Sequence, residues 1–367
     1  MDLDFLRVLD AVRAITGRRG EDHFMDQPAP LLILRSDQTG HKIVMVHDAL
    51  LGKAVLESPA YRQYNFVEKI LSVAKPERTA WIRRFCAAGL IMIDGDEHQR
   101  RRLDMDAVLD RCVDRLIGLP PAKMAAVLET AIGKSPRPSA RDVSRALVRL
   151  LFSECITAIT GKETHLPEAA LFSIDFFNPF PTLSTLYRAD AAIATCCEAI
   201  DLEQLGEAEQ AAILSLMVMG VSPIDAMLTA MMNAAITAVR AGQDAQEALR
   251  QVRGVDAYSI VATNFVMREC VAETTVAGEK IAPGDILYLF LGSASGCPFS
   301  RLNAMPFGAG QHSCSGAKLT FTMLGIVRAA LQGSIAMVGR VEPSDVEQGK
   351  ASAFLTYSVS GPKNLPA

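Results

Sequence analysis

The middle of the chain carries apolar residues at helical spacing over a long stretch. From about residue 104 to residue 241, Ala, Leu and Met recur at i, i+3 and i+4, the period of helices that bury one face. Residues 3–16 show the same spacing, and Asp48 is placed to cap another helix. Proline clusters interrupt the pattern at 119–121, 134–138 and 177–181. The pattern predicts a helical body over about 48–250 and 315–332.

Short apolar runs separated by turn residues flank this body. They predict a strand, a turn and a strand over about 30–47 and a strand-rich segment over about 255–300. The C-terminal tail, around 353–359, has a similar pattern. The individual strands predicted in the second segment cover 260–263, 270–276 and 286–291. With no internal repeat, the sequence predicts a mostly α fold with a small β-rich side (α+β), forming a single domain over 1–367.

Composition narrows the class of protein. The chain has 367 residues, of which 50% are hydrophobic and 21% charged, as in globular proteins with a large core. A formal net charge of -4 and an aromatic content of 6% argue against a nucleic-acid partner. The start, Met1-Asp-Leu-Asp, lacks the basic region of a secretory signal, so we expect a cytoplasmic protein whose eight cysteines form no disulfides.

One apolar segment, 211–239, could be taken for a membrane span. Pro223 and Asp225 interrupt it near its middle, where a charge inside a bilayer is costly. We therefore expect a long buried helix of a soluble domain and no membrane partner.

The residues with the clearest chemistry lie in a glycine-rich loop, 306–316. A cysteine in such a loop, directly before a helix, is favoured as thiolate by the unpaired N–H groups and the dipole of the helix N-terminus. A thiolate is one of the axial ligands that haem iron takes. Two other interpretations of Cys314 remain: an inert cysteine in a turn, or half of a zinc site with His312 and Cys297.

The loop resembles the cysteine loop of the cytochrome P-450 family. Phe307, Gly310, His312, Cys314 and Gly316 match its pattern F-x-x-G-x-[HR]-x-C-x-G at every fixed position. The resemblance implies the fold of that family and haem b, with Cys314 as ligand to the iron. It also implies that Phe307 packs near the sulfur, that His312 reaches a haem propionate and that the glycines allow a tight hairpin.

Further segments resemble the family in the same order along the chain. His98 and Arg102 match H-x-x-x-R, and a spacing of four places them on one helix face, where they could pair with propionates. The alternative is a solvated basic cluster. Arg268 is similar to a propionate-binding arginine of the family. A supporting cluster of Glu247, Arg250 and Arg301 is the least secure part of the alignment.

The long central helix departs from the family pattern. The family has [AG]-G-x-[DE]-T there, and its acid and alcohol relay protons during oxygen activation. In this chain Gly220 is in place, but Ser222 replaces the acid and Pro223 the threonine. Proline should preserve a kink, while Ser222 and Asp225 are the remaining candidate proton donors.

The resemblance implies a haem-thiolate monooxygenase that oxidises a small organic molecule, in specialised metabolite biosynthesis, with electrons from a ferredoxin or flavodoxin. Because the acid–alcohol pair is missing, an alternative is a haem-thiolate enzyme without reductive oxygen activation: a peroxygenase, isomerase or dehydratase. A third interpretation, suggested by short segments before the cysteine loop and in the helical middle, is a non-catalytic haem-binding relative.

Overall fold

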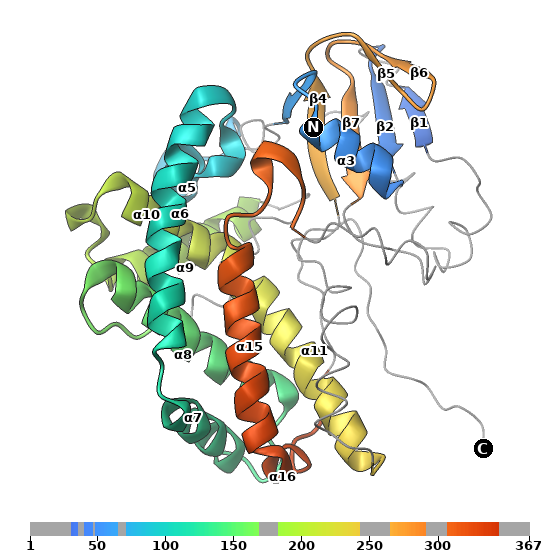
Figure 1. Ribbon diagram of the computed structural model, residues 1–367. Helices are drawn as coiled ribbons and strands as arrows, with labels where there is room; N and C mark the ends of the chain where they lie inside the picture. The colour runs from blue at the N-terminus through green and yellow to red at the C-terminus, as the bar shows by residue number, and fades with distance from the viewer. Residues whose placement is uncertain are drawn as a thin grey trace.

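The computed structural model shows a helical body with a small β-sheet at one end (Figure 1). The structure describes residues 31–35, 40–46, 48–64, 71–168, 183–242, 265–290 and 307–344, and every structural statement below concerns these residues. The predicted fold class, mostly α with a small β-rich side, is confirmed. The segments 3–16, 260–263 and 353–359, for which helix or strand was predicted, lie outside the described residues. That the whole chain, 1–367, is one domain stays a prediction.

The helices of the body begin and end close to the predicted breaks. α6 ends at Ile117, shortly before the prolines at 120–121, and α8 begins after the second proline cluster. The third cluster, at 177–181, lies outside the described residues. The larger helices are α3 (Ala49–Glu57), α5 (Ala80–Ala88), α6 (Gly95–Ile117), α7 (Pro121–Gly133), α8 (Ala140–Thr160), α9 (Leu183–Glu198), α10 (Glu207–Ser215), α11 (Val221–Arg240) and α15 (Ala317–Gly333), and a short helix, α16 (Ile335–Val338), follows.

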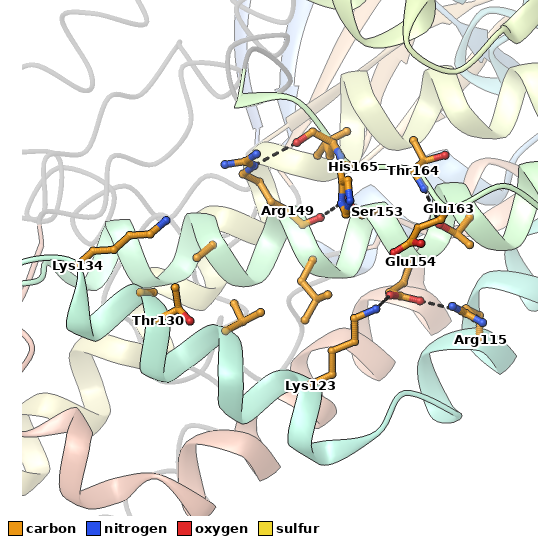
Figure 2. A pocket seen from close by; sticks show the side chains of 16 residues that line it. Arg115, Lys123, Thr130, Lys134, Arg149, Ser153, Glu154, Glu163, Thr164 and His165 are labelled. Carbon is orange, nitrogen blue, oxygen red and sulfur yellow. Dashed lines mark hydrogen bonds and ion pairs between the residues drawn. The ribbon is translucent and has the colours of Figure 1, made fainter.

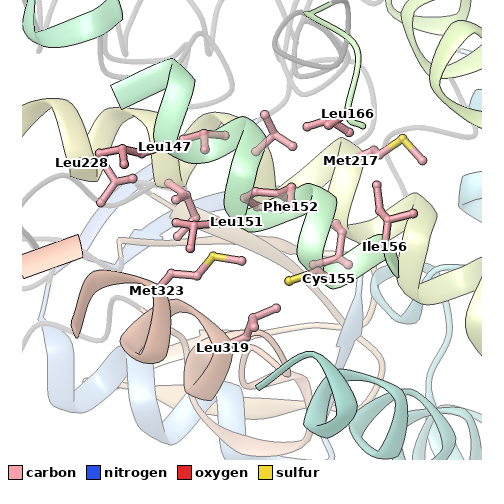
Figure 3. Close-up of a cluster of buried hydrophobic side chains, with 14 of the residues drawn as sticks. Leu147, Leu151, Phe152, Cys155, Ile156, Leu166, Met217, Leu228, Leu319 and Met323 are labelled. Atoms are coloured by element: carbon pink, nitrogen blue, oxygen red, sulfur yellow. The ribbon is translucent and has the colours of Figure 1, made fainter. Parts of the chain in front are cut away.

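Helix α8 lies at the centre of the hydrophobic core. Its residues Leu147, Leu151 and Cys155 are fully inaccessible to solvent. Figure 3 shows this row between Met217 of the long central helix on one side and Met323 of α15 on the other. Burying each such large side chain contributes about 1.5–3 kcal/mol. The core therefore fixes α15, which carries the cysteine loop at its N-terminus, against the central helix.

The small sheet has five strands in the order β1-β2-β7-β4-β3. β2 and β7 are parallel and the other neighbouring pairs antiparallel. β3, only three residues long, was not predicted from the sequence. It places Gln63 opposite Arg268 of β4. The strands are β1 (Leu31–Arg35), β2 (Lys42–Val46), β3 (Tyr61–Gln63), β4 (Phe265–Cys270) and β7 (Ile286–Phe290), and β5 (Thr274–Val276) and β6 (Glu279–Ile281) form a separate hairpin.

The strand predicted over 270–276 is confirmed only at its ends, because residues 271–273 belong to no strand. Cys270 ends β4, and β5 begins only at Thr274. The chain must leave the sheet here to form the β5–β6 hairpin, whose turn includes Ala277 at φ 48° and Gly278 at φ 83°. A run of β-favouring residues does not reveal such a change of sheet.

The central helix is kinked, as Pro223 predicts. Between α10 and α11 lies a π-helical turn, Leu216–Gly220, in which the N–H of Val221 donates to the carbonyl of Leu216, five residues earlier. Pro223 has no N–H for a helical bond and crowds the carbonyl one turn back, which accounts for the irregular turn. The two halves meet at an angle of 45°.

In the described part of the chain, no single helix combines the length and hydropathy needed to cross a membrane. Two bent helix pairs, α6 with α7 and α10 with α11, meet these criteria only when their members are joined.

Candidate functional site

The cysteine loop runs from Phe307 to the start of α15. Its backbone closes through a hydrogen bond from the N–H of Cys314 to the carbonyl of Phe307, 2.7 Å long. Gly308 and Gly310 adopt φ values of +68° and +67°, in the left-handed region that favours glycine. A Cβ on Gly310 would lie 2.4 Å from the carbonyl oxygen of Leu56 in α3. The hairpin expected of the loop is thus present, and Gly310 also allows its contact with α3.

The thiol of Cys314 lies at the N-terminus of α15. Cys314 is exposed, whereas Cys86 is half-buried and the other described cysteines are buried. Protein atoms packed around the sulfur raise the pKa of Cys314, while hydrogen bonds from the N–H groups of Gly316 and Ala317 and the charge of Arg102 act in the opposite direction. The predicted N–H donors are therefore present, but in this environment their effect on the pKa is smaller than that of desolvation. Metal coordination would deprotonate the thiol directly.

Four basic residues predicted from the sequence lie together beside this loop. His98 and Arg102 extend from α6, Arg268 from β4, and His312 from the loop itself. The rings of His98 and His312 have centroids 4.1 Å apart. Burial, followed by the nearby charges of His312 and Arg102, lowers the pKa of His98 to about 4, so this ring is neutral at pH 7. The structure therefore brings the four residues into one cluster, and the alternative of a solvated basic patch does not fit a His98 that is 2% exposed.

Several of these side chains also have partners within the protein. Arg102 donates through Nη1 to the carbonyl oxygens of Gln311, at 2.8 Å, and Ser313. Arg268 donates through Nη1 to the side chain of Gln63 and to the carbonyl of Met267, and burial lowers its pKa to about 10.

An acidic residue that the sequence interpretation missed, Asp94, joins the cluster. Its Oδ1 lies 2.7 Å from Nε2 of His312, and its pKa is also influenced by the charge of Arg268. Burial alone would raise the pKa of Asp94, but the hydrogen bonds from His312 and from the backbone of Gln63, together with these charges, lower it. The only sequence signal for Asp94 is its position four residues before His98. Nothing in the sequence singles out Gln63.

The aromatic residue of the loop, Phe307, packs against Phe321 of α15, with ring centroids 5.1 Å apart. A Cβ built on Gly316 would lie 3.6 Å from the sulfur of Cys314, so this glycine lies directly beside the thiol. The role of Phe307 in limiting solvent access to the sulfur stays a prediction.

The kinked helix accounts for some of the predicted distal residues. Gly220 faces α8, where an added Cβ would lie 3.0 Å from the ring of Phe152. Asp225 also faces α8: its Oδ1 accepts a hydrogen bond from the hydroxyl of Ser144 at 2.5 Å, and Arg145 lies 3.8 Å away. The partners of Asp225 among the described residues, Ser144 and Arg145, both lie on α8 and not in the cysteine loop. Its catalytic role stays a prediction.

Some predicted residues cannot be placed. The side chain of Ser222 and residues Glu247, Arg250, Cys297 and Arg301 lie outside what the structure describes. Among the described residues, no three His, Cys, Asp or Glu side chains are grouped so as to hold a metal ion. His312 is instead paired with Asp94.

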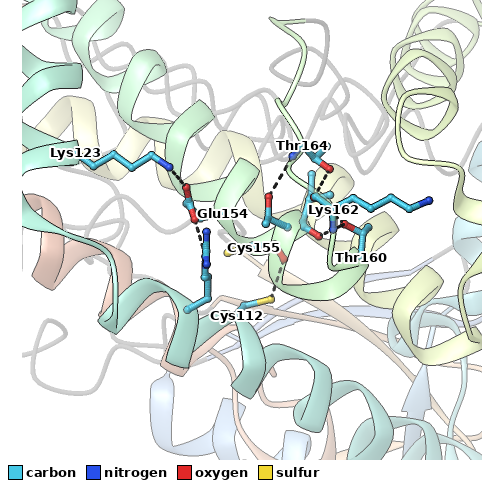
Figure 4. Close-up of polar contacts among 10 residues, drawn as sticks. Cys112, Lys123, Glu154, Cys155, Thr160, Lys162 and Thr164 are labelled. Atoms are coloured by element: carbon cyan, nitrogen blue, oxygen red, sulfur yellow. Dashed lines mark hydrogen bonds and ion pairs between the residues drawn. The ribbon is translucent and has the colours of Figure 1, made fainter.

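A separate pocket, with a volume of 580 Å³, opens between α7, α8 and residues 163–166 (Figure 2). It contains no residue of the cysteine loop. At one end Glu154, buried on α8, binds Arg115 of α6 and Lys123 of α7. Figure 4 shows that ion pair, and nearby the thiol of Cys112 donates to the carbonyl of Cys155 at 3.6 Å. These contacts connect helices α6, α7 and α8 and belong to the support of the fold.

The fold and the cysteine loop together describe one class of protein: a mostly helical protein with a kinked central helix and with a cysteine directly before a helix of the hydrophobic core. Neither a scan against protein-family models nor a search of curated proteins finds a match. Solved structures do match, and the eight considered are all cytochromes P-450.

Three of these structures illustrate the similarity. A six-coordinated cytochrome P-450 from Thermus thermophilus has a TM-score of 0.58 at 16% identity, over 88% of this chain and 90% of that one. Cyanobacterial CYP120A1 with bound retinoic acid has a TM-score of 0.57 at 15% identity, over 88% of both chains. The P-450 named BioI, in complex with acyl carrier protein carrying hexadec-9Z-enoic acid, has a TM-score of 0.55 at 15% identity, over 89% and 90%. The chain has the cytochrome P-450 fold.

Proposed function

We propose that this protein is a haem-thiolate oxidoreductase in which Cys314 ligates the iron of haem b. The observation that carries the proposal is the position of the Cys314 thiol at the N-terminus of α15, beside a cluster of basic side chains, in a chain with the cytochrome P-450 fold. Every fixed position of the family's cysteine-loop pattern is occupied.

The residues around the thiol are suited to haem. Two propionates need hydrogen-bond donors, and Arg102, Arg268 and His312 come from three different segments to the same place. The hydrogen bonds of Arg268 to described residues use only Nη1, and a guanidinium has five N–H groups, so donors remain for a carboxylate. A structural zinc site needs four protein ligands, whereas a haem-thiolate centre needs one thiolate from the protein. The single thiol of Cys314 therefore fits haem better than zinc.

A haem held by Cys314 would supply a redox-active iron whose thiolate ligand favours O–O bond cleavage. The chain's own residues then have separate tasks. The N–H groups of Gly316 and Ala317 stabilise negative charge on the sulfur. Arg102 holds the loop through its carbonyls, and His98, neutral at pH 7, can donate a hydrogen bond without adding charge.

Oxidation of a small organic molecule with oxygen and electrons from a ferredoxin or flavodoxin is the reaction that we favour. It is supported by the fold and by neighbours whose structures were solved with retinoic acid, tirandamycin C or a fatty acid on its carrier protein, all of which are organic molecules. We extend this to a role in specialised metabolism. The reaction test is substrate-dependent consumption of oxygen with a ferredoxin and its reductase.

A second candidate, haem-thiolate chemistry without reductive oxygen activation, is favoured by Pro223 and by the orientation of Asp225. The threonine hydroxyl is absent, and the nearby carboxylate binds Ser144 of α8. Turnover with peroxide, or of an oxidised substrate without any electron donor, would support this candidate. Turnover only with reductase, ferredoxin and oxygen would support the first.

The ligand itself is tested by absorption spectroscopy of the reduced carbon-monoxide complex. We expect a thiolate-type spectrum for the wild type and for Cys86→Ser, a control at a half-buried cysteine of α5. Cys314→Ser should lose that spectrum. Retention of the thiolate-type spectrum by Cys314→Ser would show that another residue ligates the iron.

A further inference from the structure

Asp94 occupies the N-cap position of α6 but does not cap that helix. Aspartate is among the preferred capping residues, and a side-chain cap stabilises a helix. The side chain of Asp94 nevertheless makes no capping hydrogen bond. Its carboxylate therefore does not make the hydrogen bond to the first turn of α6 that is usual at this position, and its partners lie elsewhere in the fold.

Those partners belong to two distant segments. Oδ2 of Asp94 accepts the backbone N–H of Gln63 in β3 at 3.0 Å. Oδ1 accepts from the side-chain amide of Gln311 at 3.2 Å and from Nε2 of His312 at 2.7 Å. Asp94 is 31% exposed and His312 only 9%, so this ion pair is partly protected from water. One carboxylate thus connects the sheet, the start of α6 and the cysteine loop.

The network also reaches Arg268. Gln63 lies opposite Arg268 in the β3–β4 register, and its side chain accepts a hydrogen bond from the guanidinium. The charge of Asp94 acts on the same guanidinium. Asp94 therefore contacts or acts on two side chains expected at the haem edge, His312 and Arg268.

Helix α6 holds the loop at a second place. Arg102 lies eight residues after Asp94, about 12 Å along the helix at 1.5 Å per residue. Its guanidinium binds the carbonyls of Gln311 and Ser313, while Asp94 binds side chains of the same loop. Two opposite charges on one helix thus fix the three residues that precede Cys314.

We propose that Asp94 is a positioning residue for the cysteine loop: through His312 and Gln311 it holds the loop, and so Cys314, in the orientation that haem ligation requires. The part concerning ligation rests on the proposed function. The anchoring of the loop rests only on the contacts above.

The test compares Asp94→Ala with Asp96→Ala in the full chain loaded with haem. Asp96 is exposed in the first turn of α6 and is the matched control. Hydrogen bonds to charged groups contribute about 1.5–3 kcal/mol, so we expect haem transfer to excess apomyoglobin to become at least about tenfold faster in Asp94→Ala. The reduced carbon-monoxide complex should also lose part of its thiolate-type spectrum. Asp96→Ala should behave as the wild type.

A double-mutant cycle separates positioning from general destabilisation. If Asp94 acts through His312, the effects of Asp94→Ala and His312→Ala on haem transfer are not additive. Asp94→Asn keeps an acceptor for the Gln63 N–H but removes the charge, and should fall between the wild type and Asp94→Ala. Additive single effects, or an unchanged transfer rate and spectrum in Asp94→Ala, would overturn the proposal.

Hydrogen exchange in the haem-free full chain gives a readout that does not depend on the proposed function. Amides of residues 308–316 should exchange faster in Asp94→Ala, while those of α8 keep their protection. Unchanged exchange in the loop would overturn the anchoring role. If the wild type binds no haem, the proposed function fails, and this measurement still decides whether Asp94 anchors the loop.

Discussion

Replacing Gly310 by alanine should be the most damaging single-methyl change in the cysteine loop. Two costs arise at this position. Its φ of +67° lies in the left-handed region, where a side chain costs about 1–2 kcal/mol. In addition, the new Cβ would lie 2.4 Å from the carbonyl oxygen of Leu56 and 3.1 Å from its carbonyl carbon. These are backbone atoms of α3, so they cannot rotate away as a flexible side chain could.

Relief of that clash requires the loop or the end of α3 to shift. Overpacking of this kind costs about 1–3 kcal/mol, so the total for Gly310→Ala is about 2–5 kcal/mol. Since proteins are stable by only about 5–15 kcal/mol, this change should lower the denaturant midpoint substantially. The measurement is equilibrium unfolding in urea, followed by circular dichroism and by haem absorbance.

Gly308→Ala provides the matched control. Gly308 has nearly the same φ, +68°, but a Cβ there would meet no atom closer than 3.8 Å. It should therefore show the backbone cost alone, about 1–2 kcal/mol. The difference between the two variants measures the contact with α3. Equal destabilisation of Gly308→Ala and Gly310→Ala would refute the argument that this contact fixes the loop.

Two further predictions concern the support of the site. Glu154→Gln should destabilise the protein by about 1–3 kcal/mol at pH 7, because Glu154 is buried but its partners Arg115 and Lys123 are each about half exposed. Burial alone would raise the pKa of Glu154, but Lys123 and Arg115 lower this pKa below its value in the unfolded chain. The carboxylate of Glu154 therefore stabilises the folded protein above pH ~4, and this stabilisation is lost as the pH falls through the pKa of the folded state. Urea unfolding of both proteins from pH 7 to pH 3 should show the difference shrinking, and a constant difference would contradict this account. Asp190 of α9 accepts a hydrogen bond from the backbone N–H of Ile82 at 2.8 Å and so caps the N-terminus of α5 from a different helix. Asp190→Ala should lower the free energy of unfolding by about 1–2 kcal/mol. Asp190→Asn should lower it by less, because the amide oxygen of asparagine still accepts this hydrogen bond. Thermal unfolding would measure both, and equal losses would exclude the capping role.

Local rules predicted much of the fold and part of the site. The prolines at 120–121 place the end of α6, Asp48 caps α3 by accepting from Leu51, and Gly310 adopts the positive φ that the loop pattern suggests. Each of these outcomes depends on a few neighbouring residues, which is why the sequence reveals them.

The contacts between distant segments could not be predicted in the same way. Asp94 and His312 are 218 residues apart, and Gln63 and Arg268 are 205 apart. Their pairing depends on how α6, β3 and the cysteine loop are brought together by the core. β3 was missed for a related reason: three residues are too short to show alternation, and this strand exists because β4 provides its partner.

Pro223 predicts the backbone of the central helix but not the hydrogen-bond partners of the residues around it. The kink of the central helix is retained because proline enforces it by removing an N–H and crowding a carbonyl. The threonine of the family pattern is absent, and the carboxylate closest in sequence, Asp225, binds Ser144 on α8. Burial raises the pKa of Asp225, although the hydrogen bond from Ser144 and the charge of Arg145 oppose this, and both of these partners lie on α8. The cysteine loop thus matches the family's sequence pattern at every fixed position, whereas the central helix matches its own pattern only at Gly220 and has a kinked backbone. For this reason a comparison of peroxide-driven with reductase-driven turnover distinguishes the two proposed reactions more directly than any variant of the cysteine loop.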